Sequence, residues 1–382
     1  MIYLAEIVFW SSLAALFYVY LGYPLLLFVV SVFFRRRPAD PTHEPFLSVL
    51  IAAYNEESGI RDKLEQTLAL DYPKDRIEII VLSDGSTDRT DQIVQDFADP
   101  RVRLLRVTGR KGKTNAQNEG VKVAKGEILI FSDATTKYHP QALRFLASNY
   151  SDPHVGAVSG RYQYFDPDGK SPTGMGTVAF WNYENLIKML QSRISTISGC
   201  CGCIYSARRS LYTSLAADVI SDLVQPLHVI RQGYRVAFED RALAYEETTQ
   251  STSQEFSMRV RVVARGFRGL LSVPELLNPL KSEWVAFQLW SHKILRWLVP
   301  FFLITLFASN VVLWHIHYLQ YFLALQALLY VFSLLCLIVP LQKVWKPLGI
   351  PLYFCTLNAA AFLSIIEVIR GKKYVVWETV RT

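Results

Sequence analysis

Four short polar runs carry side chains that could do chemistry. They read Ala-Tyr-Asn-Glu at residues 53–56, Ser-Asp-Gly at 83–85, Arg-Lys-Gly-Lys at 110–113 and Ser-Asp-Ala-Thr at 132–135. Three of the runs are acidic and one is basic. Carboxylates are ligands that Mg²⁺ and Mn²⁺ accept, and a lysine side chain pairs with phosphate. These residue types suit a nucleotide diphosphate with a divalent cation.

Each run also has a purely structural interpretation. Asp88 can cap the helix that follows it, and Asp84 can form the turn before Gly85. Asp133 ends an apolar strand with no cation nearby in the sequence, so its burial without a partner would be costly and a metal is the better interpretation. The Gly112-Lys113-Thr114 triplet resembles the end of a P-loop, but that motif needs a glycine where this chain has Val107.

The runs follow strands in an alternating pattern of strands and helices. Apolar, β-rich segments predict strands at 47–53, 77–82, 102–107 and 128–131, and helical patterns lie at 58–70, 88–98, 114–124 and 140–150. Strands this apolar indicate an α/β fold with a mainly parallel sheet covered on both faces. Because ligands bind at the carboxyl ends of such strands, the polar runs are expected to meet there.

The motifs AAYNEE, LSDGSTD, KGKTNAQNEG and FSDATT, in this order, resemble those of the family 2 glycosyltransferases. The resemblance covers about residues 46–275. It implies a GT-A fold, which is Rossmann-like, and an inverting enzyme that uses a nucleotide-diphosphate sugar. The flanking apolar segments resemble those of the membrane-integrated bacterial branch, which makes polysaccharides and glycolipids.

The resemblance also assigns roles at the donor side. Tyr54, Glu56 and Asp84 would hold the nucleoside, which we expect to be uridine, and Lys113 would lie against the base or the diphosphate. Asp133 would be the first carboxylate of a DxD-type metal motif. Thr135 replaces its second carboxylate. The divalent cation, Mg²⁺ or Mn²⁺, would then rest on Asp133, diphosphate oxygens and water.

Asp222 matches the last residue of the family's T/S-E-D segment, which is the general base, although Ser221 replaces the glutamate. At the start of a helix, the dipole stabilises an ionised carboxylate, which can accept a proton from an acceptor hydroxyl. The alternative is that Asp222 is only a helix cap. The base would then be another carboxylate, such as Glu239 or Asp240.

Other candidates follow from the same resemblance. Gly199, Cys200 and Cys201 belong to a small-residue segment that lines the acceptor side of the pocket, although the spacing of Cys200 and Cys203 also occurs in zinc and redox sites. Arg259 and Arg261 would contact the diphosphate or the acceptor, unless they belong to a solvated or lipid-facing basic face that Arg261 shares with Arg265 and Arg268.

Processive relatives carry Q-x-x-R-W near this point, with a tryptophan that stacks on the growing sugar chain. The stretch expected to correspond, residues 258–262, lacks both the glutamine and the tryptophan. Residues 293–297 read Lys-Ile-Leu-Arg-Trp and imitate the motif, but they lie later, next to the membrane. The stretch at 258–262 therefore does not predict processive synthesis.

Apolar segments at the two ends divide the chain. We expect an N-terminal span within 1–37, the catalytic domain at 38–279, an amphipathic interfacial segment at 280–296, membrane segments at 297–369 and a basic tail at 370–382. Arg35, Arg36 and Arg37 follow the first span and place the domain in the cytoplasm. The last apolar segment, 349–369, is either a third C-terminal span or a re-entrant segment, and we slightly favour a cytoplasmic tail.

Composition agrees with this division. The 382 residues include 51% hydrophobic and 19% charged side chains, with a net charge of +7, which fits contact with anionic lipid or phosphorylated substrates. Five cysteines, three of them clustered, do not form a disulfide framework.

The sequence thus predicts an enzyme of the bacterial inner membrane. Its partners would be a nucleotide-diphosphate sugar, a lipid or glycan acceptor and membrane lipids, with no nucleic acid. The alternatives are a processive synthase that secretes its polymer, and a catalytically silent membrane scaffold.

Overall fold

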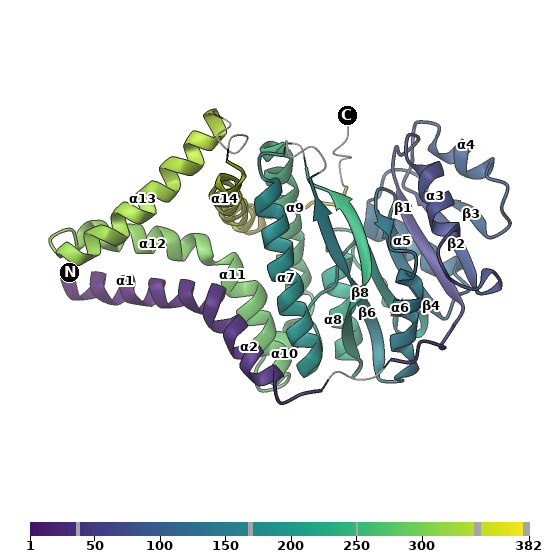
Figure 1. Ribbon diagram of the computed structural model, residues 1–382, viewed down its shortest axis with the longest axis horizontal. Helices are drawn as coiled ribbons and strands as arrows, with labels where there is room; N and C mark the ends of the chain where they lie inside the picture. The colour runs from purple at the N-terminus through teal and green to yellow at the C-terminus, as the bar shows by residue number, and fades with distance from the viewer. Residues whose placement is uncertain (36–38, 167–170, 250, 340–344, 377–382) are drawn as a thin grey trace.

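The computed structural model describes residues 1–35, 39–166, 171–249, 251–339 and 345–376. A sheet domain joins a bundle of long apolar helices (Figure 1). The first half of the sheet has four parallel strands in the order β3-β2-β1-β4. These are β1 (Leu47–Ala53), β2 (Ile77–Ser83), β3 (Val102–Arg106) and β4 (Ile128–Asp133).

The second half of the sheet mixes directions. Beyond β4 the order continues β7-β6-β8-β5, with β7 antiparallel to both neighbours, β6 parallel to β8 and β5 antiparallel to β8. These strands are β5 (Lys137–Tyr138), β6 (Val155–Phe165), β7 (Ile204–Arg208) and β8 (Arg235–Glu247). The predicted α/β class with a mostly parallel, Rossmann-like sheet is confirmed.

Helices cover both faces of the sheet because its strands are apolar on both. In β1, Val49 and Ile51 belong to one buried cluster and Leu50 to the cluster on the opposite face, as expected for parallel strands. The covering and flanking helices are α3 (Ile60–Leu68), α4 (Thr90–Gln95), α5 (Lys113–Val123), α6 (Ala142–Ser148), α7 (Gly174–Ile194), α8 (Ser221–Arg231) and α9 (Thr252–Leu271).

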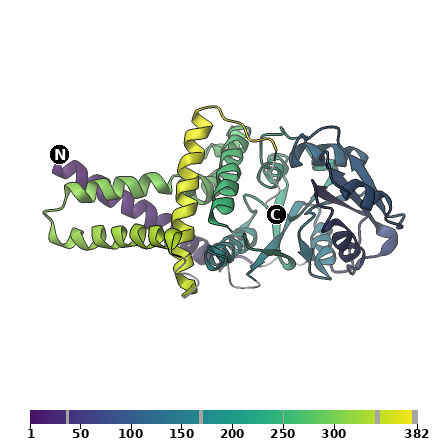
Figure 2. The same ribbon diagram turned by 90° about the horizontal axis from the view of Figure 1, so that it is seen from above.

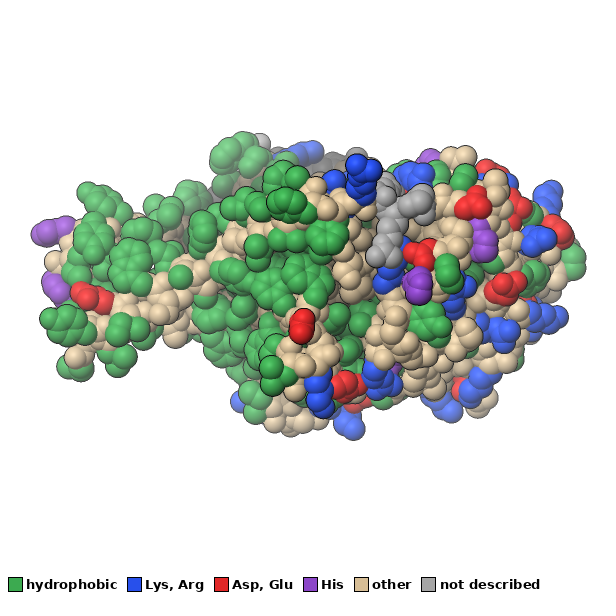
Figure 3. All heavy atoms as spheres, turned by 90° about the horizontal axis from the view of Figure 1, so that it is seen from below, with side chains coloured by type: hydrophobic (Ala, Val, Ile, Leu, Met, Phe, Trp, Pro, Cys, Tyr) green, Lys and Arg blue, Asp and Glu red, His purple; other side chains and the backbone are tan. Residues whose placement is uncertain are grey.

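The remaining helices are mostly apolar, although the segment from Glu283 to Trp297 also carries charged side chains. They are α1 (Ile2–Phe17), a π-helical turn (Tyr18–Gly22), α2 (Tyr23–Ser31), α10 (Glu283–Leu289), a second π-helical turn (Trp290–Ile294), α11 (Leu295–Trp297), α12 (Val299–Val312), α13 (His317–Ile338) and α14 (Gly349–Ile369). Among the described residues, three helices are long and apolar enough to cross a membrane, or four if the bent pair from Glu283 to Val312 is one span. Hydrophobic side chains cover this part of the surface, and charged ones gather over the sheet domain (Figure 3).

The helix α14 does not run alongside α12 and α13. It lies across them and packs on α9 and α7 of the sheet domain (Figure 2). After α14 the chain turns at Gly371, with φ of +80°. The guanidinium of Arg268 then donates a hydrogen bond to the carbonyl of Lys372, at 2.9 Å. The described start of the tail therefore contacts the sheet domain. Arg36 and Arg37, on which the orientation prediction partly rests, lie outside the described residues.

Candidate active site

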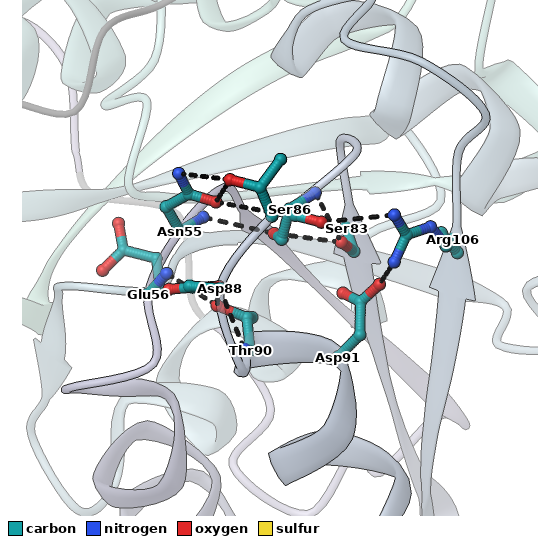
Figure 4. A network of polar contacts seen from close by, with 9 residues as sticks. Asn55, Glu56, Ser83, Ser86, Asp88, Thr90, Asp91 and Arg106 are labelled. Atoms are coloured by element: carbon teal, nitrogen blue, oxygen red, sulfur yellow. Dashed lines mark hydrogen bonds and ion pairs between the residues drawn. The ribbon is translucent and has the colours of Figure 1, made fainter.

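The loops after β1 and β2 are fastened to each other (Figure 4). Asp88 accepts hydrogen bonds from the backbone N–H groups of Glu57, at 3.0 Å, and Thr90, at 3.0 Å. The Thr90 hydroxyl accepts from the N–H of Glu56, at 2.8 Å. Asn55 adopts the left-handed region, with φ of +54°, and its side chain accepts from the N–H of Thr87. Asp88 therefore connects the first N–H group of α4 to the loop that contains Glu56.

Asp84 holds the basic loop. Its fully buried carboxylate accepts hydrogen bonds from the N–H groups of Lys111 and Gly112, both at 2.8 Å. Burial raises the pKa of Asp84, and these two N–H groups oppose the rise. Gly112 has a φ of +91°, and a Cβ there would lie 2.2 Å from the carbonyl oxygen of Val375 in the tail. Loop and tail thus meet at a position that requires glycine.

Tyr54 lies beside the same loop. The guanidinium of Arg110 stands 4.0 Å from the centre of the Tyr54 ring, a cation–π contact. The structure therefore brings Tyr54, Asp84 and the 110–113 loop together at the carboxyl ends of β1 and β2. Glu56 lies two residues after Tyr54, in the loop that Thr90 and Asp88 hold in place.

Lys113 bridges the basic loop to β4. Its ammonium pairs with the carboxylate of Asp133, whose side chain is 29% exposed, and also donates to the carbonyl of Gly202 at 3.2 Å. Burial lowers the pKa of Lys113, but the carboxylates of Asp133 and Asp222 outweigh it and raise the pKa. Thr135 donates to Glu246 at 3.3 Å. Lys113 therefore balances the charge of Asp133. The Asp133 carboxylate is partly exposed and fits the role of a single protein ligand for a divalent cation.

Asp222 occupies the first turn of α8. Burial raises the pKa of its carboxylate, against the opposing charge of Lys113. A Cβ on Gly202 would lie 3.0 Å from Asp222 Oδ2, and the N–H of Cys200 donates to the Asp222 carbonyl at 2.8 Å. The small-residue segment therefore passes directly against Asp222.

Asp222 opens on a cavity of about 330 Å³ between the sheet domain and the apolar helices. Gly199, Cys200 and Arg259 line it too, whereas Cys201 is buried and accepts a hydrogen bond from Lys188. The aromatic and aliphatic part of the wall comes from the first helix, α7, α9, the 290–297 segment and α14: Tyr20, Ala179, Phe180, Trp181, Tyr183, Val262, Val263, Trp297, Ile350, Tyr353, Phe354, Leu357 and Ala361.

The arginines of α9 separate into different environments. Arg259 donates to Glu255 at 2.7 Å and to the Tyr353 hydroxyl at 2.8 Å, and so reaches the cavity already paired. Arg265 is buried and donates to the Thr114 hydroxyl at 2.8 Å. Burial and the neighbouring charge of Arg261 lower the pKa of Arg265 to about 10. A single solvated basic face is therefore wrong for Arg265, which fastens α9 to α5.

The cysteines offer no zinc site in the described part of the chain. Cys200, Cys201 and Cys203 are free and buried. The described residues contain no group of three or more His, Cys, Asp or Glu side chains placed to hold a metal ion. Any divalent cation at Asp133 would thus need further ligands from the substrate and from water.

The comparisons with known proteins agree with this geometry. Residues 48–215 match the model of glycosyl transferase family 2. Residues 48–215 therefore resemble a family 2 glycosyltransferase domain. The chain is 29% identical to the probable glycosyltransferase YdaM of Bacillus subtilis over 57% of this chain and 54% of that protein. It is 28% identical to the poly-β-1,6-N-acetyl-D-glucosamine synthase of Staphylococcus epidermidis over 66% of this chain and 64% of that protein.

A solved structure has the same fold. The mannosyltransferase PcManGT of Pyrobaculum calidifontis, in complex with GDP-mannose and Mn²⁺, matches 96% of this chain and 99% of its own, with a TM-score of 0.72 and 22% identity. The GT-A fold is therefore confirmed. The chain spans between about half and two thirds of the length of the curated relatives named above.

The cavity wall also includes residues that the sequence analysis does not select as site residues. Arg296 and Trp297 line the cavity that Asp222 opens on, and the Trp297 ring lies 4.6 Å from that of Phe267. The Arg-Trp pair in the cavity wall is the one at 296–297, and the stretch at 258–262 has no tryptophan. The x-x-Arg-Trp spacing at 294–297 was the available signal. Glu184 and Lys188 also line the cavity. They belong to α7, and no sequence motif marks either of them as a site residue.

Proposed function

We propose that the protein is a membrane-bound inverting glycosyltransferase. It moves a hexosyl or N-acetylhexosaminyl group from a nucleotide-diphosphate sugar, a UDP-sugar, to a hydroxyl of a lipid-linked or glycan acceptor. The observation that carries the proposal is the position of Lys113, which pairs with Asp133 and donates to the carbonyl of Gly202 at 3.2 Å. Gly202 lies directly against Asp222, because a Cβ there would be 3.0 Å from Asp222 Oδ2. Donor and acceptor groups are thereby adjacent.

The nucleoside would bind against Tyr54, Glu56 and Asp84, since the fastened loops at the ends of β1 and β2 bring these residues together. Lys113 would leave Asp133 and pair with the diphosphate, because its ammonium already sits beside the basic loop. A divalent cation held by Asp133 would neutralise charge on the leaving diphosphate.

Asp222 would act on the acceptor as the general base. As the acceptor oxygen bonds to the anomeric carbon, its proton passes to the Asp222 carboxylate. The bond from that carbon to the diphosphate oxygen breaks, and the nucleoside diphosphate leaves with the electron pair. One displacement inverts the anomeric configuration. Gly199 and Cys200 leave room for the acceptor beside Asp222.

A processive polysaccharide synthase is the second candidate. It is favoured by Arg296 and Trp297 in the cavity wall and by the similarity to a polysaccharide synthase. The silent scaffold is disfavoured because Asp84, Asp133 and Asp222 are all present.

The test is a screen of radiolabelled nucleotide-sugars with the purified protein and bacterial lipid extracts. Transfer of a single sugar to a lipid supports the main proposal, and polymer supports the second candidate. No transfer from any donor, with no hydrolysis, would contradict both.

The catalytic domain is proposed to face the cytoplasm of a bacterial inner membrane. The contact between Arg268 and the carbonyl of Lys372 supports a tail on the same side as the domain. In this topology α14, which lies across α12 and α13 (Figure 2), would not be a full span.

A further inference from the structure

The cavity beside Asp222 holds a cluster of buried cations outside the donor loops. Lys188 comes from α7 and is 2% exposed. Lys293 and Arg296 come from the segment that leads into α12. All three line the cavity. They surround one buried carboxylate, Glu184, which pairs with Arg296 and lies 3.7 Å from the ammonium of Lys293.

The charges within this cluster do not balance. Glu184 also bonds to His292 at 2.9 Å, so its two oxygens are shared among three neighbours. Lys188 donates to the sulfur of Cys201 at 3.1 Å, and a thiol is a weak acceptor. Three cations therefore face two carboxylates, Glu184 and Asp222, and one positive charge remains unbalanced. A buried charge is costly unless it is paired, so an anion would stabilise this arrangement.

The cation cluster lies outside the proposed binding site of the donor diphosphate. Lys113, Asp133 and Asp84, which form the donor side, are not among the described residues that line the cavity. Arg259, which does line it, already pairs with the buried Glu255. The cluster thus belongs to the acceptor side, together with Asp222.

The wall facing the cluster is apolar. Ile350, Phe354 and Leu357 of α14 contribute to it, as does Tyr20 of the first apolar helix. Both helices belong to segments that are long and apolar enough to enter a membrane. An occupant that satisfies both walls carries an anionic group and a hydrocarbon chain.

We infer that the acceptor is a phosphate-bearing lipid. Its phosphate binds Lys188, Lys293 and Arg296, its chain lies along α14, and its reacting hydroxyl reaches Asp222. A phosphate group is anionic at neutral pH and would balance the positive charge that Glu184 and Asp222 leave uncompensated. The proposed phosphate site lies close to Asp222. A Cβ on Gly199 would lie 3.9 Å from both the backbone carbonyl oxygen of Asp222 and Cε of Lys293.

The chemistry of this inference rests on the proposed function, but the binding site can be tested alone. The purified full-length protein, in a maltoside detergent, is titrated with octyl phosphate, octyl glucoside and inorganic phosphate. The readout is tryptophan fluorescence, because Trp181 and Trp297 line the cavity. Octyl phosphate is expected to bind at least about tenfold more tightly than either other probe, as for a charge-assisted hydrogen bond.

Variants identify the site. Lys188→Met is expected to weaken octyl phosphate binding about tenfold or more, and Lys188→Arg, which keeps the charge, to preserve the preference for phosphate. Lys122→Met is the matched control, since Lys122 is exposed and pairs with Glu119 away from the cavity. Lys293→Met provides a second loss of charge if Lys188→Met does not fold.

Equal binding of octyl phosphate and octyl glucoside would overturn the inference, as would equal loss in Lys188→Met and Lys122→Met. Binding of inorganic phosphate as tight as that of octyl phosphate would show an anion site without a lipid and would also overturn it. Calorimetry with UDP and Mn²⁺ separately tests the donor side. Octyl phosphate binding without UDP binding would contradict the proposed function and leave the lipid site standing.

Discussion

The ammonium of Lys113 pairs with the carboxylate of Asp133 at the end of β4. Asp222, from a helix more than eighty residues further along the chain, also raises the pKa of this lysine. Lys113 thus stands between the carboxylate assigned to the donor and the carboxylate assigned to the acceptor. A bound diphosphate would compete with both for the lysine.

Asp133→Ala should abolish the dependence of UDP binding on divalent cations, because the only carboxylate assigned to the metal is removed. Calorimetric titration of UDP with and without Mn²⁺ measures this effect. Asp75→Ala, an exposed substitution, is the control. An unchanged Mn²⁺ effect in the Asp133 variant would place the metal elsewhere.

Turnover should fall on acidification at a pH above the usual range of an aspartate. Burial raises the pKa of Asp222, above its ordinary value of about 3.9, and a protonated Asp222 cannot accept the acceptor's proton. The turnover number is measured at saturating substrate as pH is lowered. It should fall as for the uptake of a single proton, with a midpoint at a pH above that value. A flat profile through the mildly acidic range would exclude Asp222 as the titrating base.

Glu184→Gln should destabilise the junction between the domain and the apolar helices. Burial raises the pKa of Glu184, but Arg296, His292 and Lys293 outweigh it and hold the pKa well below its usual range. Loss of this charge leaves buried cations uncompensated, at a cost of about 3–5 kcal/mol. The stabilisation is present above the usual carboxyl pKa and disappears as pH falls through the depressed value.

Thermal unfolding of the purified protein measures this cost at neutral pH. Glu119→Gln, which removes an exposed partner of Lys122, should change the midpoint little. An equal midpoint for the two variants would show that Glu184 does not hold the junction.

Cysteines at Asp40 and Lys373 should both resist an impermeant maleimide in intact cells, because domain and tail are proposed to lie inside. A cysteine at His315, in the exposed connection between α12 and α13, should react and is the positive control. Labelling at Asp40 would invert the topology. Labelling at Lys373 alone would show that α14 crosses the membrane and that the tail does not contact Arg268.

The sequence predicted the parallel half of the sheet well because its signals are local. The strand from Leu47 to Ala53 begins and ends as predicted, and Asp133 lies at the end of β4. The cation cluster could not be predicted. Glu184 and His292 are far apart in the chain, and only the packing of α7 against the 290–297 segment brings them together.

The same limit explains the arginines of α9 and the Arg-Trp pair. The spacing of Arg261, Arg265 and Arg268 indicates that they share a helix face. It does not indicate that Thr114 and Val219 accept hydrogen bonds from Arg265 and bury it. The position of Trp297 in the cavity depends on the bend after α11, where α12 leaves at 56°, and a linear motif search does not include that bend.

The most direct test of the central claim is Asp222→Asn, which keeps the size of the side chain but removes its basic charge. With the UDP-sugar and acceptor found by the screen, donor affinity and turnover are measured separately. We predict nearly unchanged donor affinity and a fall in turnover of at least about 100-fold, as for a lost general base. A collapse of donor affinity would assign Asp222 to the donor site, and unchanged turnover would show that it only begins a helix.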